Sequence, residues 1–288
     1  MNVLVVGASG LLGRNLILKI KNKAKVYAIT RKEIRIKESK ILKMDLSEID
    51  FEVNNLPSDI EMIYYLAQSS KYKDFPEGSE DMLKINIVAP LKFINWAIKN
   101  KVKKFVYASS GGIYTNPTQP IKEFFTINAN QKLGFYLGTK LSAELLLRNY
   151  ASYFKLFAII RPFFMYGPNQ KKTMLIPKLI ESVRKGQTIF LQGENGIKIN
   201  PIYIEDAAGA VANLLDLEGE FIFNIAGEEI VSIRELCNVI GAILNKKPVF
   251  KIIDENSADL IADITLMKNF LHKPAISLKK GIELTIGG

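Results

Sequence analysis

Cysteine and histidine, which build many catalytic and metal-binding sites, are almost absent from this chain: its 288 residues include one of each. A single cysteine cannot close an intramolecular disulfide, and a lone histidine excludes a multi-histidine metal site. Cys237 lies at an apolar helical position, where we expect a small buried residue, and His272 lies in a polar stretch, where we expect a surface residue. We therefore expect no metal site.

Long hydrophobic runs are also missing. The strongest, "LFAIIRPFFMYG", is interrupted by Arg161 and falls short of the ~20 apolar residues that span a bilayer. The opening stretch "MNVLVVGASG" has no basic segment and passes straight into a glycine turn, unlike a signal peptide. We expect a cytoplasmic protein with no membrane partner.

Acidic residues are outnumbered, with 29 Asp and Glu against 39 Lys and Arg, which gives a formal net charge of +10. The basic residues are mostly lysines spread over the whole chain. This pattern is typical of a solvated surface that favours phosphate-bearing ligands, and not of a nucleic-acid-binding face. We expect no nucleic-acid partner.

Short β-branched runs alternate with helical patterns in the first half of the chain, which predicts βαβ crossovers. We expect an α/β fold, a Rossmann-type doubly wound parallel sheet with a smaller C-terminal substrate lobe. Strands are predicted at residues 3–6, 26–29, 41–44, 62–67, 104–109 and 156–161. The predicted dinucleotide-binding domain is residues 1–165, completed by roughly 202–225, and the lobe is residues 166–201 and 226–288. Ser232 and Glu235 have the spacing of a capping box at the start of a helix in that lobe.

The segment "VLVVGASGLLGRNL" places Gly7, Gly10 and Gly13 directly after the first predicted strand and at the start of a helix. Glycine permits a tight turn and close approach of backbone N–H groups to a pyrophosphate, which the helix N-terminus also attracts. The spacing is G-x-x-G-x-x-G. It predicts dinucleotide binding.

The end of the second strand should lie near the adenosine ribose, where a carboxylate selects NAD and an arginine selects NADP. Here the chain reads Thr30, Arg31 and Lys32, with no carboxylate before Glu33. We therefore favour NADP over NAD. Asp45 closes the third strand and is expected either to accept a hydrogen bond from the adenine amino group or to cap the next segment.

Tyr136 and Lys140 are four residues apart, so on a helix they share one face. A tyrosine that exchanges its proton near neutral pH needs its pKa lowered by ~3 units, or ~4 kcal/mol. An ammonium ~6 Å away at an effective dielectric of ~20 supplies ~2.8 kcal/mol. The positive nicotinamide ring of an oxidised cofactor would supply the rest. The strand at residues 104–109 ends in Ser109 and Ser110, whose hydroxyls can reach a substrate oxygen at the carboxyl edge of the sheet.

With "GASGLLG", Asp45-Leu46, "YLA", Asn86, "SSGGIY", "YLGTK", "RPFFMYGP" and "NPIYIEDAA", the chain resembles the extended short-chain dehydrogenase/reductases, in the NAD-dependent epimerase/dehydratase group. The resemblance implies a catalytic triad of Ser110, Tyr136 and Lys140, with Lys140 also holding the nicotinamide ribose, and a homodimer. The cofactor residues that it implies are Gly7, Ser9, Gly10, Leu11, Leu12, Gly13, Thr30, Arg31, Asp45, Leu46, Leu66, Ala67, Gln68, Asn86, Ser109, Tyr136, Lys140, Pro162 and Phe163. The substrate residues are Ser69, Ser110, Gly111, Phe164, Lys198 and Asn200.

The chain departs from the family pattern at three places. Dehydratases of the family carry an Asp-Glu pair after the catalytic hydroxyl, where this chain has Gly111 and Gly112, so we do not expect dehydration. Many nucleotide-sugar members carry asparagine where this chain has Phe164, and an arginine in the later loop, where Lys198 and Asn200 are the polar residues here.

These observations predict an NAD(P)-dependent epimerase or reductase that acts on a sugar nucleotide by hydride transfer. Two alternatives stay open. One is an NADP-dependent reductase of a non-nucleotide carbonyl substrate, and the other is a non-catalytic dinucleotide-binding protein. The sequence leaves open the sugar, the base of its nucleotide and the direction of reaction.

Overall fold

Seven parallel strands form the central sheet of the structure, a computed structural model that describes residues 1–31, 39–48, 51–114, 120–128, 130–254 and 258–288. Their order across the sheet is β11-β6-β5-β4-β1-β2-β3, and every neighbouring pair is parallel. The strands are β1 (Asn2–Val6), β2 (Lys25–Thr30), β3 (Lys40–Lys43), β4 (Met62–Tyr65), β5 (Lys104–Ala108), β6 (Leu156–Pro162) and β11 (Gly219–Ile225). The order reverses direction between β1 and β4, so the predicted Rossmann-type sheet is confirmed, and ligands of such sheets bind outside the carboxyl edge at this reversal.

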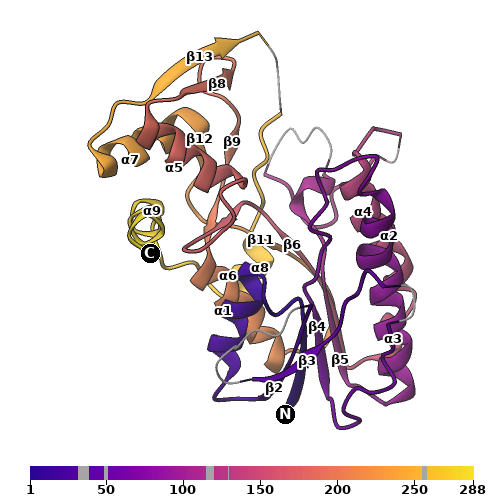
Figure 1. Cartoon of the computed structure of the whole chain (residues 1–288). Coiled ribbons are helices and arrows are strands. Elements are labelled where there is room, and N and C mark those ends of the chain that lie inside the picture. The colour runs from indigo at the N-terminus through magenta and orange to yellow at the C-terminus, as the bar shows by residue number, and fades with distance from the viewer. Residues whose placement is uncertain (32–38, 49–50, 115–119, 129, 255–257) are drawn as a thin grey trace.

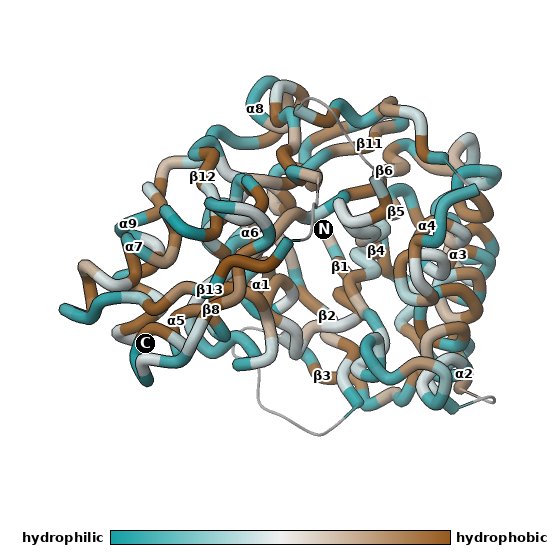
Figure 2. Tube along the Cα trace, turned by 90° about the horizontal axis from the view of Figure 1, so that it is seen from above, coloured by the Kyte–Doolittle hydropathy of each residue, from teal (hydrophilic) through white to brown (hydrophobic). Residues whose placement is uncertain are grey.

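Helices cover both faces of the sheet (Figures 1 and 2). Helices α1 (Leu11–Ile20) and α6 (Ile204–Ala212) pack on one face, and α3 (Ala89–Lys99) and α4 (Phe135–Arg148) pack on the other. In β1 the side chains alternate between the two cores: Val3 and Val5 belong to the first, and Leu4 and Val6 to the second. A strand buried on both faces must be apolar at every position, which explains the continuous hydrophobic runs in the sequence.

The segment that leads into α3 is not a single regular α-helix. It consists of α2 (Ser79–Leu83), a π-helical turn η1 (Lys84–Val88) and then α3. The wider turn changes the backbone hydrogen bonding, and two buried tyrosines bond its carbonyls: Tyr65 donates to Ile85 O at 2.5 Å and Tyr107 donates to Asn86 O at 3.1 Å. The sheet thereby holds the π turn, and Asn86 with it, against β4 and β5.

The C-terminal half adds smaller elements beyond α1 and α6 (Figure 1). The capping box at Ser232 and Glu235 is present, and Cys237 is fully buried. The helices are α5 (Leu175–Lys185), α7 (Ile233–Leu244), α8 (Thr265–Phe270) and α9 (Leu278–Gly287), with 3₁₀ turns η3 (Ala151–Tyr153) and η4 (Asn213–Asp216). A further 3₁₀ turn, η2 (Gly111–Ile113), lies earlier in the chain, between β5 and α4. The paired strands are β8 (Thr188–Gln192) with β13 (Val249–Ile253), β9 (Lys198–Ile199) with β12 (Val231–Ser232), and β7 (Met165–Tyr166) with β10 (Ile202–Tyr203). The division of the chain at residues 165, 202 and 225 stays a prediction.

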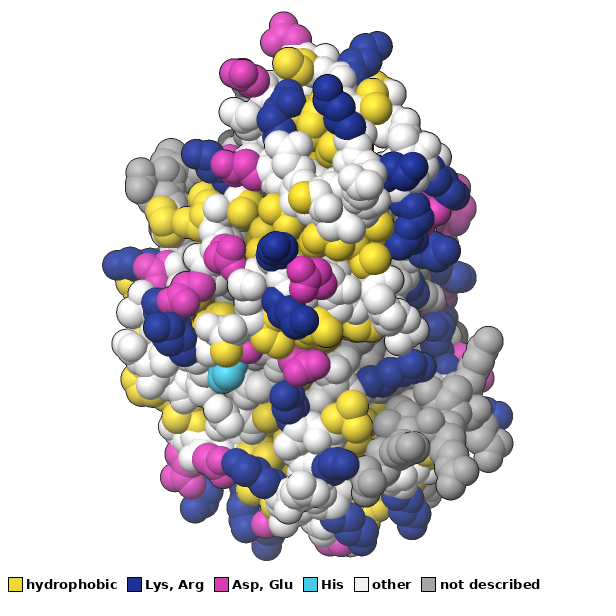
Figure 3. Space-filling model, turned by 90° about the vertical axis from the view of Figure 1, so that its left-hand side faces the viewer, with side chains coloured by type: hydrophobic (Ala, Val, Ile, Leu, Met, Phe, Trp, Pro, Cys, Tyr) yellow, Lys and Arg dark blue, Asp and Glu magenta, His cyan; other side chains and the backbone are white. Residues whose placement is uncertain are grey.

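Lysines and arginines are spread over the height of the face shown in Figure 3, with acidic side chains among them. No helix within the described ranges combines the length and the apolar composition that a membrane crossing needs. Among the same residues, no group of three or more His, Cys, Asp and Glu side chains is arranged to hold a metal ion.

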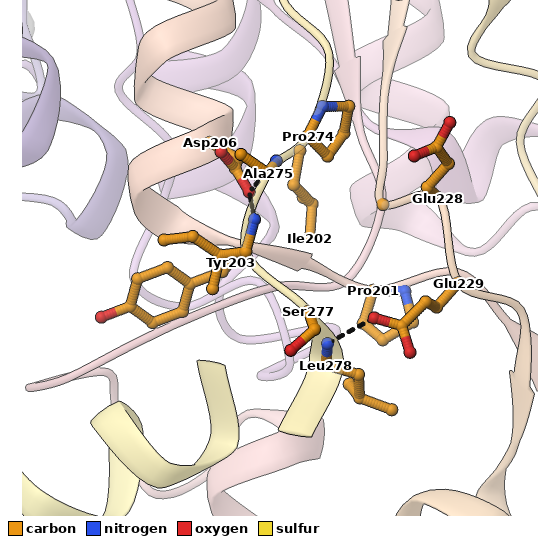
Figure 4. Close-up of a pocket in the computed structure, with 12 residues that line it drawn as sticks. Pro201, Ile202, Tyr203, Asp206, Glu228, Glu229, Pro274, Ala275, Ser277 and Leu278 are labelled. Carbon is orange, nitrogen blue, oxygen red and sulfur yellow. Dashed lines mark hydrogen bonds between the residues drawn. The ribbon is translucent and has the colours of Figure 1, made fainter. Parts of the chain in front are cut away.

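The C-terminal segment is held by two carboxylates around a cavity of about 210 Å³ (Figure 4). Asp206, which is 4% exposed, accepts hydrogen bonds from Ala275 N at 3.1 Å and Ile276 N at 2.9 Å. Its other oxygen lies 2.9 Å from His272 Nε2. The prediction of a surface position for His272 is therefore wrong in part, because its side chain is only 30% exposed and packs on this carboxylate. Glu229 accepts from Leu278 N at the start of α9.

We expect the Asp206→Ala substitution to lower the free energy of unfolding by about 2–4 kcal/mol, because it leaves two backbone N–H groups without their acceptor. Urea denaturation measures the change. Glu228→Ala is the matched control and should remain close to wild type, since this carboxylate lines the same cavity but is half-exposed and bonds the side chain of Lys268. Equal losses in the two variants would contradict the assigned role of Asp206.

Candidate active site

Three predicted catalytic side chains converge at the carboxyl ends of β4 and β5. The Tyr136 hydroxyl donates to Gln68 Oε1 at 2.9 Å, and it also has the Ser110 hydroxyl as a hydrogen-bond partner. Lys140 lies one turn further along α4, and its Nζ donates to the carbonyl of Ala108 at 2.8 Å, at the end of β5. Ser110 Oγ also accepts from Gly112 N at 3.2 Å, which begins the 3₁₀ turn η2 and orients the hydroxyl.

Lys140 is a buried cation in an apolar setting. It is 1% exposed, and its Nζ lies 5.1 Å from the centre of the Tyr107 ring. Burial lowers the pKa of Lys140 from 10.5 to about 7, and the Glu144 carboxylate acts in the opposite direction. Near neutral pH this amine can therefore both hold and release a proton.

Tyr136 is a buried phenol. Burial raises the pKa of Tyr136 from 10.0 to about 12, whereas the hydrogen bond with Ser110 lowers it and the neighbouring Tyr72 raises it. Burial disfavours the phenolate of Tyr136 and also the ammonium of Lys140 that would stabilise it. The lowered pKa expected from the sequence required an oxidised nicotinamide as well as Lys140, and it stays a prediction.

The glycine turn between β1 and α1 leaves no room for side chains. Gly7 has a φ of +87°, and a Cβ there would lie 2.6 Å from Ala67 N, while a Cβ on Gly13 would lie 2.5 Å from Gly7 O. Helix α1 begins at Gly10 without a side-chain cap and without an acidic residue in its first turn. Its N–H groups and dipole are therefore directed at a position that suits an anion. These residues fit the pyrophosphate of a dinucleotide.

A second observation supports a ligand at this edge of the sheet. Ser109 is 5% exposed, and its hydroxyl has no hydrogen-bond partner within the part of the chain that the structure describes. A buried hydroxyl without a partner is costly unless a ligand completes it. The residue lies at the end of β5, between Ala108 and Ser110.

The predicted adenosine end of the site lies at β2 and β3. Thr30 is buried at the end of β2, and Arg31 after it is exposed; Lys32 and Glu33 lie outside the described residues. Asp45 Oδ1 accepts from Ser47 N at 3.0 Å and Ser47 Oγ at 2.7 Å, which corresponds to the capping alternative. Burial raises the pKa of Asp45, but these hydrogen bonds and the charge of Arg31 outweigh it and lower the pKa.

Asn86 connects the π turn to α4. Its Oδ1 accepts from Ser69 N at 3.3 Å, and its Nδ2 donates to Thr139 Oγ1 at 2.9 Å, which in turn donates to Tyr136 O at 2.7 Å. Ser69 was predicted to bind substrate, but it is fully buried and its hydroxyl donates to Asp81. These side chains therefore shape the protein side of the site and position the backbone of Tyr136.

Asn200 also differs from the prediction of a substrate contact, whereas the prediction for Lys198 stays a prediction. Asn200 is 2% exposed, donates to Gly227 O at 3.0 Å and Ala262 O at 2.9 Å, and accepts from Ala262 N at 3.0 Å. Its amide is used in joining segments of the C-terminal half, so the prediction for Asn200 is wrong. Lys198 lies on β9 with an exposed side chain.

The positions after Ser110 and β6 fit together closely. A Cβ on Gly111 would lie 2.4 Å from the buried ring of Phe163, so no larger residue fits there without displacing that ring. Phe164 follows with a φ of +40°, in the left-handed region that bulky residues rarely adopt. Such strain often marks a functional position. The side chain of Phe164 is partly buried against the core.

The other predicted cofactor residues surround the glycine turn and the strand ends. Leu12, Leu46 and Ala67 are buried, whereas Leu11, Leu66 and Pro162 are partly buried and Ser9 is exposed.

Sequence reasoning did not assign Tyr72, Glu144 or Arg161 to the site. The Tyr72 ring lies 5.4 Å from the Tyr136 ring, and its hydroxyl bonds Met174 Sδ at 3.1 Å. Arg161 had a signal, because a charge inside a buried strand requires a partner.

The pKa of Lys140 predicts a pH-dependent contribution to stability. Between about pH 7 and 10.5 the unfolded chain keeps the proton on this lysine and the native state releases it, so stability rises with pH in that window. Urea denaturation measures the free energy of unfolding of the wild type and of Lys140→Met at each pH. The difference, wild type minus variant, should rise between about pH 7 and 10.5. Lys19→Met, at an exposed position on α1, controls for loss of a lysine as such. A flat or falling difference would contradict the burial of the charge.

Comparison with known proteins identifies relatives. The chain is 25% identical to UDP-glucuronate 4-epimerase of Thermodesulfobacterium geofontis, over 98% of this chain and 94% of that protein. It is 29% identical to dTDP-4-dehydro-6-deoxyglucose reductase of Escherichia coli, over 70% of this chain and 66% of that protein. The solved structure of UDP-glucuronic acid 4-epimerase from Bacillus cereus, in complex with UDP-glucuronic acid and NAD, superposes with a TM-score of 0.86. It is 22% identical and covers 100% of this chain and 98% of that one, which shows a shared fold.

The family model of the NAD dependent epimerase/dehydratase family matches residues 3–226. This range includes the glycine turn, the seven strands of the sheet and the Ser110, Tyr136 and Lys140 positions. The chain therefore belongs to the NAD-dependent epimerase/dehydratase family.

Proposed function

We propose that this protein is a dinucleotide-dependent epimerase of a UDP-linked sugar, acting by reversible hydride transfer with Ser110, Tyr136 and Lys140 as its catalytic residues. One observation carries the proposal. The Tyr136 hydroxyl has the Ser110 hydroxyl as a hydrogen-bond partner at the edge of the sheet, and the buried Lys140 lies one helical turn away. The UDP-glucuronate 4-epimerase matches over 98% of this chain, whereas the reductase matches over 70% of it. This supports epimerisation over reduction.

In the proposed reaction, Tyr136 takes the proton of a sugar hydroxyl while that carbon loses hydride, and it returns the proton after the keto sugar has turned. Ser110 hydrogen-bonds the same oxygen. A nicotinamide bound at this edge would accept and return the hydride, and its positive charge when oxidised would favour the phenolate. Lys140, with its pKa near neutrality, holds a proton within the site and stabilises the ionised phenol.

Dehydration is not part of the proposed activity, because Gly111 and Gly112 stand where dehydratases of the family carry an acid and a base. The structure adds a steric reason, since the Phe163 ring fills the space that a side chain at position 111 would need. Of the predicted substrate contacts, Ser110, Gly111, Phe164 and Lys198 remain proposed.

We propose NAD as the cofactor, instead of the NADP that Arg31 suggested. The charge of Arg31 acts on the Asp45 carboxylate, so a 2′-phosphate placed there would meet a negative group. The Bacillus cereus structure of the same fold contains NAD. The cytoplasmic location expected from the sequence stays a prediction.

We expect the protein to interconvert UDP-glucuronate or UDP-glucose with its 4-epimer in the presence of NAD, with no net change in the absorbance of reduced nicotinamide. Tyr136→Phe should lower kcat by about 10²–10⁴-fold, because it removes the acid and base. Tyr153→Phe, at a tyrosine that is 65% exposed, is the control and should retain activity. Product analysis by chromatography, with NAD and separately with NADP, measures the epimerisation by the wild type and the kcat of each variant.

Other outcomes of this experiment identify the alternatives. Net consumption of reduced cofactor with a 4-keto sugar would mean a reductase. A Tyr136→Phe protein that retains wild-type turnover would contradict the catalytic triad. Dinucleotide binding without turnover of either nucleotide sugar would favour the binding protein.

We also propose a homodimer, formed through the face of α2, η1 and α4 that lies away from the sheet. Leu83, Val88, Leu145 and Leu146 are 43%, 43%, 59% and 43% exposed on these neighbouring elements. Large exposed apolar residues gathered on adjacent helices are typical of a self-association surface.

The Leu145→Glu substitution should shift the protein from dimer to monomer in sedimentation velocity, because it places a charge in the proposed interface. Leu18→Glu is the control, since Leu18 is 53% exposed on α1, away from this face. A wild-type protein that sediments as a monomer, or equal effects of both substitutions, would rule out this interface.

A further inference from the structure

Arg161 is a buried charge whose guanidinium bonds three different groups. Its Nε and Nη2 donate to the two oxygens of Glu144 at 3.0 and 2.5 Å, and its Nη1 donates to Tyr114 Oη at 2.6 Å and Glu123 O at 2.8 Å. The side chains of Arg161 and Glu144 are 4% and 2% exposed. The guanidinium is thus fully enclosed by its partners.

The partners of Arg161 belong to the two segments that carry the catalytic residues. Glu144 lies on α4, one turn beyond Lys140 and two turns beyond Tyr136. Tyr114 directly follows the turn η2, which begins after Ser110. The Tyr114 ring also stacks on the Phe163 ring at 6.0 Å, and that ring contacts the Gly111 position. One guanidinium therefore connects the helix of Tyr136 and Lys140 with the segment of Ser110.

Stability alone does not account for this arrangement. Burying the charges of Arg161 and Glu144 removes their hydration, and the free energy of their attraction offsets little more than this loss. An apolar pair of similar volume would therefore stabilise a fold about as well. The planar guanidinium adds a fixed geometry, because its N–H groups hold the Glu144 carboxylate and the Tyr114 hydroxyl in a set orientation relative to each other. A lysine ammonium at this position could not do so. The arrangement is therefore suited to holding a geometry.

We propose that Arg161 is a positioning residue for the reaction, which acts through Glu144 and Tyr114 to hold the Ser110 hydroxyl against the Tyr136 hydroxyl. This inference rests on the proposed function. The Glu144 carboxylate has a further effect within the same contact, because it opposes the influence of burial on the pKa of Lys140. Neither Arg161 nor Glu144 touches the reacting atoms.

The mildest test is Tyr114→Phe, which keeps the ring stack on Phe163 and removes the hydroxyl that accepts from Arg161 and donates to Asn224 Oδ1 at 2.9 Å. A catalytic oxygen misplaced by about 1 Å costs up to about 10²-fold in rate, so we expect kcat to fall about 10-fold or more. KM for the UDP-sugar and the Kd for NAD, measured by titration of protein fluorescence, should change less than about 2-fold, because the binding surfaces are intact. Glu144→Gln, an isosteric change at the other end of the contact, should behave in the same way.

Tyr166→Phe is the matched control. Tyr166 is 1% exposed and bonds Leu278 O at 3.4 Å, so its hydroxyl is as buried as that of Tyr114 but lies away from the triad. We expect this variant to lose stability to urea and to retain kcat. A merely structural role of Tyr114 would produce this same pattern, and that result would overturn the proposal.

A double-mutant cycle with Ser110→Ala gives the decisive measurement. If Arg161 acts by holding Ser110, Tyr114→Phe should lower kcat less than about 2-fold once the serine hydroxyl is gone. Additive losses would overturn the proposal. A Tyr136→Phe protein with wild-type turnover would show separately that the proposed function is wrong. That result would overturn this inference as well. If Glu144→Gln does not fold, Tyr114→Phe and the cycle decide the outcome alone.

Discussion

The ion pair between Arg161 and Glu144 is the contact on which the arrangement of the site depends. Both side chains are buried away from water, so each hydrogen bond of the guanidinium and the carboxylate must be made within the protein. That requirement admits only a narrow range of positions for α4 against β6. Because Tyr136 and Lys140 lie on α4, the same requirement limits where the phenol and the amine can be, and it links them to Tyr114 and the turn after Ser110.

The π turn before α3 provides a second constraint on the same helix. Tyr65 and Tyr107 direct their hydroxyls at its carbonyls, and Asn86 then bridges Ser69 and Thr139. Helix α4 is thus held by a charged contact on the side of β6 and by neutral amide and hydroxyl contacts on the side of β4. Two independent supports of this kind suit a site that must keep a phenol within hydrogen-bonding distance of a substrate oxygen.

The family relationship is clearest at the glycine turn and weakest where the substrate is expected. The turn is packed so tightly that Gly7 and Gly13 admit no side chain. On the substrate side, Phe163 fills the space beside Gly111, and Phe164 adopts a left-handed backbone that asparagine tolerates better than phenylalanine. Asn200, expected to face the substrate, joins chain segments instead. The residues predicted for the substrate side therefore depart from the pattern that the resemblance implied, whereas the glycine turn keeps it.

Local pattern alone was enough to predict the alternation of strands and helices, the glycine turn, and the capping box at Ser232, because each depends on residues that are neighbours in the chain. Tertiary structure decided the rest. The π turn requires Tyr65 and Tyr107 from two different strands, and the burial of Ser69 and Asn200 depends on partners 12 to 62 residues away. The protonation of Tyr136 and Lys140 was also undetermined by their spacing, because a pKa depends on how much water the whole fold removes from a group, and no local pattern records that.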